Sequence, residues 1–258
     1  MTRPRATTSP SDALGATIAD LKARLARLEN IAHQHRVLGS HLGLQEVLYF
    51  DTVGTDSFVK SDYPWLRAVR VRVQGGGGGG GRTDGVINTG AAGGGGGVYA
   101  ESFISDLSTI TDPITVAVGG GGAGGTSVGA GTGGTGGASS FGSLVVASGG
   151  LGGGRGFGTG RSGGPNDIAT SGAGDVVIAG GSGHPCFFQN TDVTTGPFGG
   201  AGGASRLGNG SRYTLPNNNG AVGVGAGSGG GGASNGGSAV LRNGGAGAQG
   251  IVIVELYA

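Results

Sequence analysis

The chain lacks the features that stabilise or direct several familiar classes of protein. Its single cysteine, Cys186, cannot form an intrachain disulfide, which excludes a disulfide framework. No apolar run approaches the roughly 20 residues of a membrane-spanning helix, and the first residues show no hydrophobic secretory segment. Basic and acidic residues number 16 and 15, so the net charge of +1 offers no field for nucleic acid or an anionic membrane.

Proline is scarce and glycine is abundant. With only 8 prolines and no glycine at every third position, the chain cannot form a collagen triple helix. Glycine accounts for 67 of the 258 residues, with seven in succession at 75–81. Each glycine in regular structure costs about 0.5–1 kcal/mol relative to alanine. Such a chain is therefore either a flexible linker or a structure held together by close packing of its backbone.

Short β-branched segments interrupt the glycine tract and favour the packed structure. Runs of valine and isoleucine bounded by glycine are typical of strands, whereas a flexible linker lacks them. Valines alternate with Arg70 and Arg72, which predicts a strand with one buried face. Residues 251–254 are apolar on both faces, so we expect them inside a sheet or between layers. The predicted strands are 47–50, 69–73, 114–118, 144–147, 176–179 and 251–254.

The N-terminal residues predict an extended arm followed by a coiled coil. Ser9 and Pro10 supply an N-cap and a first helical position. Apolar residues then recur in alternating steps of four and three, which is the seam of a coiled coil. The stretch 24–29 resembles the trimerisation motif of three-stranded coiled coils, in which an arginine pairs with a glutamate of the next chain. We expect a parallel homotrimer whose trimerisation residues are Leu14, Ile18, Leu21, Arg24, Leu25, Leu28 and Glu29.

Packing of this helix against its own globular domain is the alternative. The narrow apolar stripe and the charged flanks favour self-association instead. His35 falls at a core position of the seam, where three copies would meet on the axis. These histidines either hold an ion or water, or are polar residues tolerated near the end of the coil. We predict no bound metal and no cofactor.

Several blocks of the remaining sequence, taken together, resemble a known family. The blocks are 58–64, 66–81, 114–125, 139–144 and 250–257. Their ordered series resembles the glycine-rich domain of bacteriophage tail proteins of the minor tail or tail-fibre type, as found in phages of actinobacteria, and it covers 45–258. The resemblance implies a virion protein made in the host cytoplasm. Related adhesins bind host surfaces, and some contain polyglycine II helices packed in a sandwich.

The predicted architecture is mainly β. We expect an extended arm at 1–10, a trimeric coiled coil at 11–39, a linker with the first strand at 40–66, and a glycine-rich domain at 67–258. This last domain should be similar to a β-sandwich. Without Cβ atoms, glycine tracts can approach closely enough for their backbone groups to bond to one another. Whether the tracts form polyglycine II segments or β loops is open from the sequence alone.

Motifs for catalysis are weak. Three matches to G-x-S-x-G, at 125–129, 160–164 and 232–236, are expected by chance in so much glycine. No helix follows them, as a nucleophile elbow requires. The acidic residues form no recognisable pair, so we expect no enzyme. Cleavage of a glycan is the alternative that these acids leave open.

Residues for recognition are expected where glycine thins out and aromatic or amide side chains appear. Three segments qualify, at 155–167, 184–198 and 206–219. Loops on a rigid scaffold often carry recognition, and aromatic faces beside amides suit sugar rings. The alternatives are that the two phenylalanines belong to the core and that the asparagines form a turn. The candidates for receptor contact are Phe157, Arg161, Phe187, Phe188, Asn190, Asp192, Arg212, Tyr213, Asn217, Asn218 and Asn219.

The expected function is that of a homotrimeric tail fibre that acts as a receptor-binding adhesin in the virion. Its N-terminal region would join other tail proteins, and its glycine-rich domain would contact a glycan or protein of the host envelope. We expect no nucleic-acid partner and no membrane insertion. The alternative is a purely structural minor tail or tail-tip component without receptor contact. A non-viral glycine-rich protein, such as an ice-binding or cell-wall polypeptide, is a third hypothesis.

Overall fold

The computed structural model describes residues 21–29, 43–127, 131–156, 169–188 and 196–258. The chain divides into two compact units, Met1–Leu44 with Ala258, and Gln45–Tyr257. The first unit contains a helix at 21–29, inside the predicted coiled coil. The described part of this single chain contains that helix but no coiled coil. The other seam positions, Leu14 and Ile18, lie outside the described residues, as does His35.

Two five-stranded antiparallel sheets lie in the second unit. The order of the first sheet is β1 (Leu44–Phe50), β16 (Ile251–Tyr257), β3 (Ala68–Gln74), β5 (Tyr99–Ile104) and β10 (Val176–Ile178). The order of the second is β2 (Gly54–Phe58), β6 (Ile114–Val118), β7 (Ser139–Phe141), β8 (Val145–Ala147) and β9 (Gly172–Ala173). All six predicted strands are confirmed, with shifted ends at most of them, whereas the other four strands of these sheets, β2, β5, β7 and β9, were not predicted.

The side chains of both sheets meet in one hydrophobic core. The alternation predicted for β3 is confirmed, because its three valines are fully buried while Arg70 and Arg72 remain partly exposed. β16 lies between β1 and β3, in agreement with its apolar character on both faces. The residues at the centre of the core include Phe58, Val69, Val71, Val73, Val116, Phe141, Val145, Val252, Val254 and Leu256.

Shorter elements complete the described chain. Two 3-10 turns lie at Lys60–Asp62 and Leu107–Thr109. Three two-stranded pairs are formed by β4 (Thr89–Gly90) with β15 (Ser234–Asn235), β11 (Phe187–Phe188) with β12 (Pro197–Phe198), and β13 (Leu207–Gly208) with β14 (Gly225–Ala226). No helix among the residues with described positions is long and apolar enough to cross a membrane.

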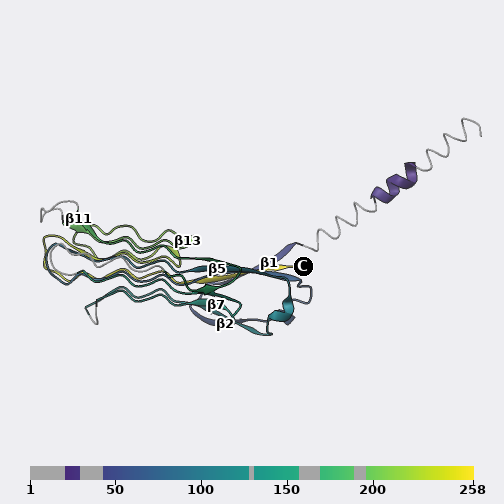
Figure 1. Cartoon of the computed structure of the whole chain (residues 1–258), viewed down its shortest axis with the longest axis horizontal. Helices are drawn as coiled ribbons and strands as arrows, with labels where there is room; N and C mark the ends of the chain where they lie inside the picture. The colour runs from purple at the N-terminus through teal and green to yellow at the C-terminus, as the bar shows by residue number, and fades with distance from the viewer. Residues whose placement is uncertain (1–20, 30–42, 128–130, 157–168, 189–195) are drawn as a thin grey trace, which may run out of the picture. The chain divides into compact units, whose positions relative to one another are not determined.

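The glycine tracts leave the sheets as extended segments that run side by side (Figure 1). Residues 75–81 lie inside this bundle, and their N–H groups donate hydrogen bonds to three neighbouring segments in turn. Gly76 and Gly79 donate to the segment at 134–137, and Gly77 and Gly80 to the segment at 245–248. Gly78 and Gly81 donate to the segment at 92–95, and all six N···O distances are 2.8 or 2.9 Å. Each neighbour thus receives a bond from every third residue.

The carbonyl groups of residues 76–81 likewise accept hydrogen bonds from three further segments in turn. They accept from segments at 150–153, 122–125 and 230–233, again at every third residue. A strand repeats every second residue, whereas a polyproline II-type helix repeats every third. The central tract therefore has the hydrogen-bond period of a threefold helix with six neighbours, which is the period that a polyglycine II segment would have.

Close approach of these backbones requires glycine. A Cβ placed on Gly79 would overlap the carbonyl oxygen of Ala123, and one on Gly80 would overlap the carbonyl oxygen of Gly231. Because the obstructing atoms belong to backbone that is itself hydrogen-bonded, they cannot move aside as a flexible side chain could. The high glycine content is thus explained by packing of backbone against backbone.

Candidate functional site

The structure places seven of the eleven residues that the sequence proposed for receptor contact. These are Phe187, Phe188, Arg212, Tyr213, Asn217, Asn218 and Asn219. The other four, Phe157, Arg161, Asn190 and Asp192, lie outside the described residues. The first candidate segment is therefore described only up to Gly156. The structure describes the third segment fully and the second at 184–188 and 196–198, so the predictions for these residues can be compared with it.

The second and third segments meet in one aromatic cluster. Phe187 of β11 stacks on Phe198 of β12, with ring centroids 4.9 Å apart and planes at 1°. The ring of Tyr213 meets Phe187 edge to face, with centroids 5.0 Å apart. Tyr213 also contacts the ring of His184, and its hydroxyl lies 3.2 Å from His184 Nδ1. Sequence reasoning treated the two segments as separate candidates.

Backbone pairing explains why these segments come together. Gly199 and Thr214 exchange two hydrogen bonds, with N···O distances of 2.9 and 3.0 Å. Phe198 precedes one of these residues, and Tyr213 precedes the other. β11 and β12 pair Phe187 with Phe198, so the three rings are fixed relative to one another. β11 lies at the end of the extended segments remote from the sheets (Figure 1).

The cluster remains accessible to solvent. Phe187 is 42% exposed, Phe188 38% and Tyr213 40%. None of the three belongs to the core between the sheets, so burial of the phenylalanines in that core does not occur. Accessible aromatic rings held in a fixed arrangement offer a large contact area at a small cost in conformational entropy.

The three asparagines form a turn and are exposed as well. Asn217 has a positive φ of 62°, and its Oδ1 accepts from Gly236 N–H and from the Ser238 hydroxyl. Asn218 donates Nδ2–H to the Pro216 carbonyl, and Asn219 Oδ1 accepts from Asn243 N–H. The turn interpretation is therefore right in part, because each amide stabilises local backbone. Asn218 Oδ1 and Asn219 Nδ2 have no partner within the described chain and can bind a ligand.

A groove of 280 Å³ lies beside the aromatic cluster. Its lining includes four of the predicted residues, namely Arg212, Tyr213, Asn218 and Asn219, together with Thr214, Leu215 and Ala221. Ala221 lies outside the predicted segments. Thr214, Leu215, His184 and Phe198 lie inside them but were not among the individual candidates. The position of His184 at the start of the second segment was the only signal for its inclusion. We call the aromatic cluster and this groove together the tip surface.

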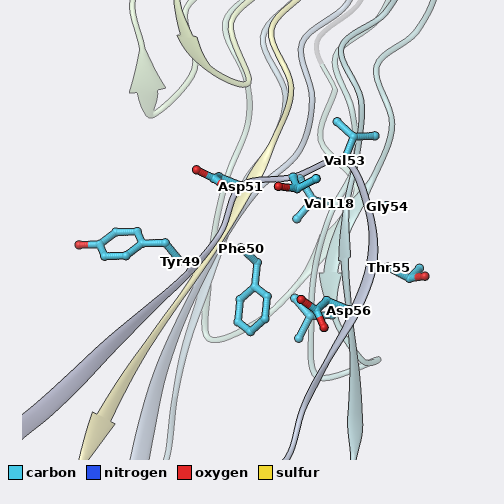
Figure 2. A pocket seen from close by; sticks show the side chains of 10 residues that line it. Tyr49, Phe50, Asp51, Val53, Gly54, Thr55, Asp56 and Val118 are labelled. Carbon is cyan, nitrogen blue, oxygen red and sulfur yellow. The ribbon is translucent and has the colours of Figure 1, made fainter.

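Two other hollows each contain a pair of carboxylates. In the 180 Å³ hollow between β1 and β2, Asp51 and Asp56 lie at different ends and point in different directions (Figure 2). In the 320 Å³ hollow near β5, Asp175 accepts from Phe103 N–H and Asp106 from Ser108 N–H. Hydrogen bonds from Ser108 hold the pKa of Asp106 below its usual value. No group of three potential metal ligands occurs among the residues described.

The main cluster of charges lies on the outer face of the first sheet and is paired internally. Arg70 bonds to Glu101 at 2.6 Å, and Arg72 bonds to Glu255. Burial, aided by the hydrogen bond to Glu101, raises the pKa of Tyr99 to about 12. Burial acts to raise the pKa of Glu101, but hydrogen bonds from Tyr99 and Arg70 outweigh it and hold that pKa below its usual value. These groups stabilise the sheet.

A comparison with known families covers most of the chain. The family model described as a glycine-rich domain matches residues 52–257. The match includes both sheets apart from β1, all the extended glycine segments and the tip surface. No curated protein matches the chain.

Proposed function

The chain belongs to the glycine-rich domain family, and we propose that it is a homotrimeric receptor-binding protein of a phage tail. In this proposal the N-terminal helix joins three copies and attaches them to the particle. The glycine tracts form polyglycine II helices that carry the tip surface away from the sheets. The tip surface then binds a glycan of the host envelope.

The aromatic cluster of the tip surface carries the proposal. Three rings, Phe187, Phe198 and Tyr213, are fixed by backbone pairing, and two of them are about two-fifths exposed. A sugar ring presents C–H groups on one face and hydroxyls around its edge. The exposed aromatic rings can pack against the C–H groups. Asn218 Oδ1 and Asn219 Nδ2, which have no partner within the described chain, can form hydrogen bonds with the hydroxyls.

The scaffold supports this role because it is held by regular backbone hydrogen bonds. A binding surface gains affinity when its groups are already fixed before the ligand arrives. Backbone hydrogen bonds tie the tip surface to neighbouring segments, between Gly199 and Thr214 and between Asn218 and Ser234. Loops held in this way are the usual location of recognition residues.

The helix supports association of copies. Its seam residues Leu21, Leu25 and Leu28 are 55–63% exposed, and a stripe of exposed leucines is stabilised when it is buried against equivalent stripes. Arg24 and Glu29 flank this stripe, as the trimerisation motif requires.

The alternative, a purely structural tail component, draws on a different feature. β10 forms an open edge of the first sheet, and Val176, Val177 and Ile178 are all exposed, by 40–47%. Natural proteins usually protect such edges with charges, proline or a covering element. An uncovered apolar edge favours lateral contact with another protein of the particle, and such contact requires no receptor.

A comparison of two full-length proteins tests the proposal. We expect the fluorescently labelled wild type to bind actinobacterial cells of particular strains in a saturable manner. The double variant Phe187→Ser/Tyr213→Ser should fold but lose this binding. Equal binding by wild type and variant would exclude the tip surface as the receptor contact. A matched control, Val176→Ser/Ile178→Ser, alters two exposed apolar residues of β10 and should leave cell binding unchanged.

A further inference from the structure

Arg212 is a charged group within the lining of the groove. The ion pairs of the described chain all lie on the outer face of the first sheet, at Arg70 and Arg72, so Arg212 takes part in none of them. The groove lining contains no carboxylate. The positive charge of Arg212 is thus not neutralised by any described neighbour in the groove.

The charge of the surrounding segments has the same sign. The described residues from 176 to 250 include Arg206, Arg212 and Arg242 but no aspartate or glutamate. The acid of this part of the sequence, Asp192, lies outside the described residues. Of these three arginines, Arg212 alone lines the groove, so its charge is the one that attracts a ligand of opposite sign into this concave surface.

The other polar groups of the groove complement this charge. Asn219 Nδ2 can donate, since its Oδ1 is already bonded to Asn243 N–H. Thr214 is only 5% exposed, and its hydroxyl has no hydrogen-bond partner within the described chain. Buried polar groups without partners are uncommon in folded proteins. Because this oxygen is itself buried, the polar contacts open to a ligand in the groove come from Arg212 and from the amide of Asn219.

We propose that the groove binds a glycan whose sugar carries a negative charge, a carboxylate or a phosphate, and that Arg212 binds this charge. A guanidinium matches either group with two parallel hydrogen bonds. The hydroxyls of a neutral sugar can also accept from the guanidinium, but they carry no opposite charge, and hydrogen bonds between charged groups are roughly twice as strong as neutral ones. At 280 Å³ the groove is slightly smaller than the roughly 300–1,000 Å³ of ligand pockets in general, and it suits a single ring.

This inference rests on the proposed function and names the class of its receptor. The test uses labelled full-length protein and cell walls purified from a panel of actinobacteria. One portion of each wall is left untreated, one has its carboxylates amidated, and one has its phosphodiesters removed with hydrofluoric acid. We expect binding to untreated walls and loss of binding to one of the two treated forms, and the form that loses binding identifies the group.

Variants of Arg212 separate charge from other effects. Arg212→Gln should weaken binding to untreated walls by at least about tenfold, since hydrogen bonds to charged groups contribute roughly 1.5–3 kcal/mol. The affinity of Arg212→Lys for untreated walls should lie between those of Arg212→Gln and the wild type, because lysine retains the charge but cannot form two parallel hydrogen bonds. Arg206→Gln removes an exposed arginine of the same segment outside the groove, and it should bind like the wild type.

The outcomes distinguish the two proposals. If wild type binds untreated and both treated walls equally well, or if Arg212→Gln binds like wild type, the acidic ligand is excluded and the adhesin proposal stands. If wild type binds no untreated wall, the adhesin proposal itself is contradicted. An unfolding temperature of Arg212→Gln equal to that of the wild type confirms that any loss of binding is local and does not come from unfolding.

Discussion

Phe187 and Tyr213 come from different segments of the sequence, and their rings meet edge to face with centroids 5.0 Å apart. This contact joins the two segments into one surface. It depends on the backbone bonds between Gly199 and Thr214, so the position of Tyr213 is set by the scaffold. Both rings remain accessible, and a ligand can contact them together.

Tyr213 allows the ring and the hydroxyl to be tested separately. Tyr213→Phe retains the contact with Phe187 and loses only the hydroxyl near His184 Nδ1, so it should keep most of the binding to cells. Tyr213→Ala removes the ring, whose aromatic pairing contributes about 0.5–1.5 kcal/mol, and should weaken binding by about two- to tenfold. Saturation binding of both variants checks this, and equal affinities would show that the ring has no role.

Glycines of the bundle should differ sharply in their tolerance of a methyl group. Gly79→Ala places a Cβ against the Ala123 carbonyl oxygen, and overpacking of this kind typically costs about 1–3 kcal/mol. Gly120→Ala is the matched control, because the nearest atom to its Cβ is a methyl group of Val53 at 3.5 Å. It should be neutral or stabilise the protein by up to about 1 kcal/mol, since alanine restricts the unfolded chain.

Urea denaturation of the two glycine variants measures this difference in the free energy of unfolding. Equal stabilities of Gly79→Ala and Gly120→Ala would contradict close backbone packing as the reason for the glycine content.

The oligomeric state should depend on the helix. We expect the full-length protein to be trimeric by light scattering, and Leu25→Asp to be monomeric, because a carboxylate at a seam position cannot be buried in a coiled coil. Lys22→Ala, on a flank of the helix, should remain trimeric. A monomeric wild type, or a trimeric Leu25→Asp, would show that the helix does not hold the copies together.

Stability should fall in acid because of Glu101. Its pKa is lower in the folded state than its usual value of 4.5, so ionised Glu101 stabilises the fold above that value. This contribution is lost as the pH falls through the lower, folded-state pKa. Between neutral pH and pH 3, Glu101→Gln should lose less stability than wild type.

The control for the acid effect is Glu46→Gln, which changes an exposed carboxylate without an ion pair in the described chain. It should follow the wild-type dependence on pH. Thermal unfolding across this range provides the measurement, and identical curves for Glu101→Gln and wild type would contradict the role of Glu101.

Local patterns predicted six of the ten strands in the two five-stranded sheets but did not decide the structure of the glycine tracts. Alternation of valine and arginine gives β3 its two faces, and an apolar character on both faces places β16 inside a sheet. β5 was missed because Glu101 and Ser102 interrupt its apolar pattern. The resemblance offered polyglycine II segments as one of two possibilities for these tracts. The threefold hydrogen-bond period of 75–81 could not be decided from the residues, because it arises from six neighbouring segments and the glycines themselves carry no pattern.

The tip surface was predicted residue by residue but not as an assembly. The scarcity of glycine singled out Phe187 and Tyr213, but no pattern in the sequence indicated that they touch. Their contact arises from the pairing of Gly199 with Thr214, which is a relationship between distant backbones. The groove was missed for the same reason, because Thr214 and Ala221 have no chemical feature that marks them in the sequence.

Saturation binding of labelled full-length protein to a panel of actinobacterial strains tests the central claim most directly. The account predicts saturable binding to some strains and none to others, with binding lost when Phe187 and Tyr213 are both replaced by serine. A folded trimer that binds no strain in a panel containing its host would contradict the account. In that case the protein would be a structural component of the tail.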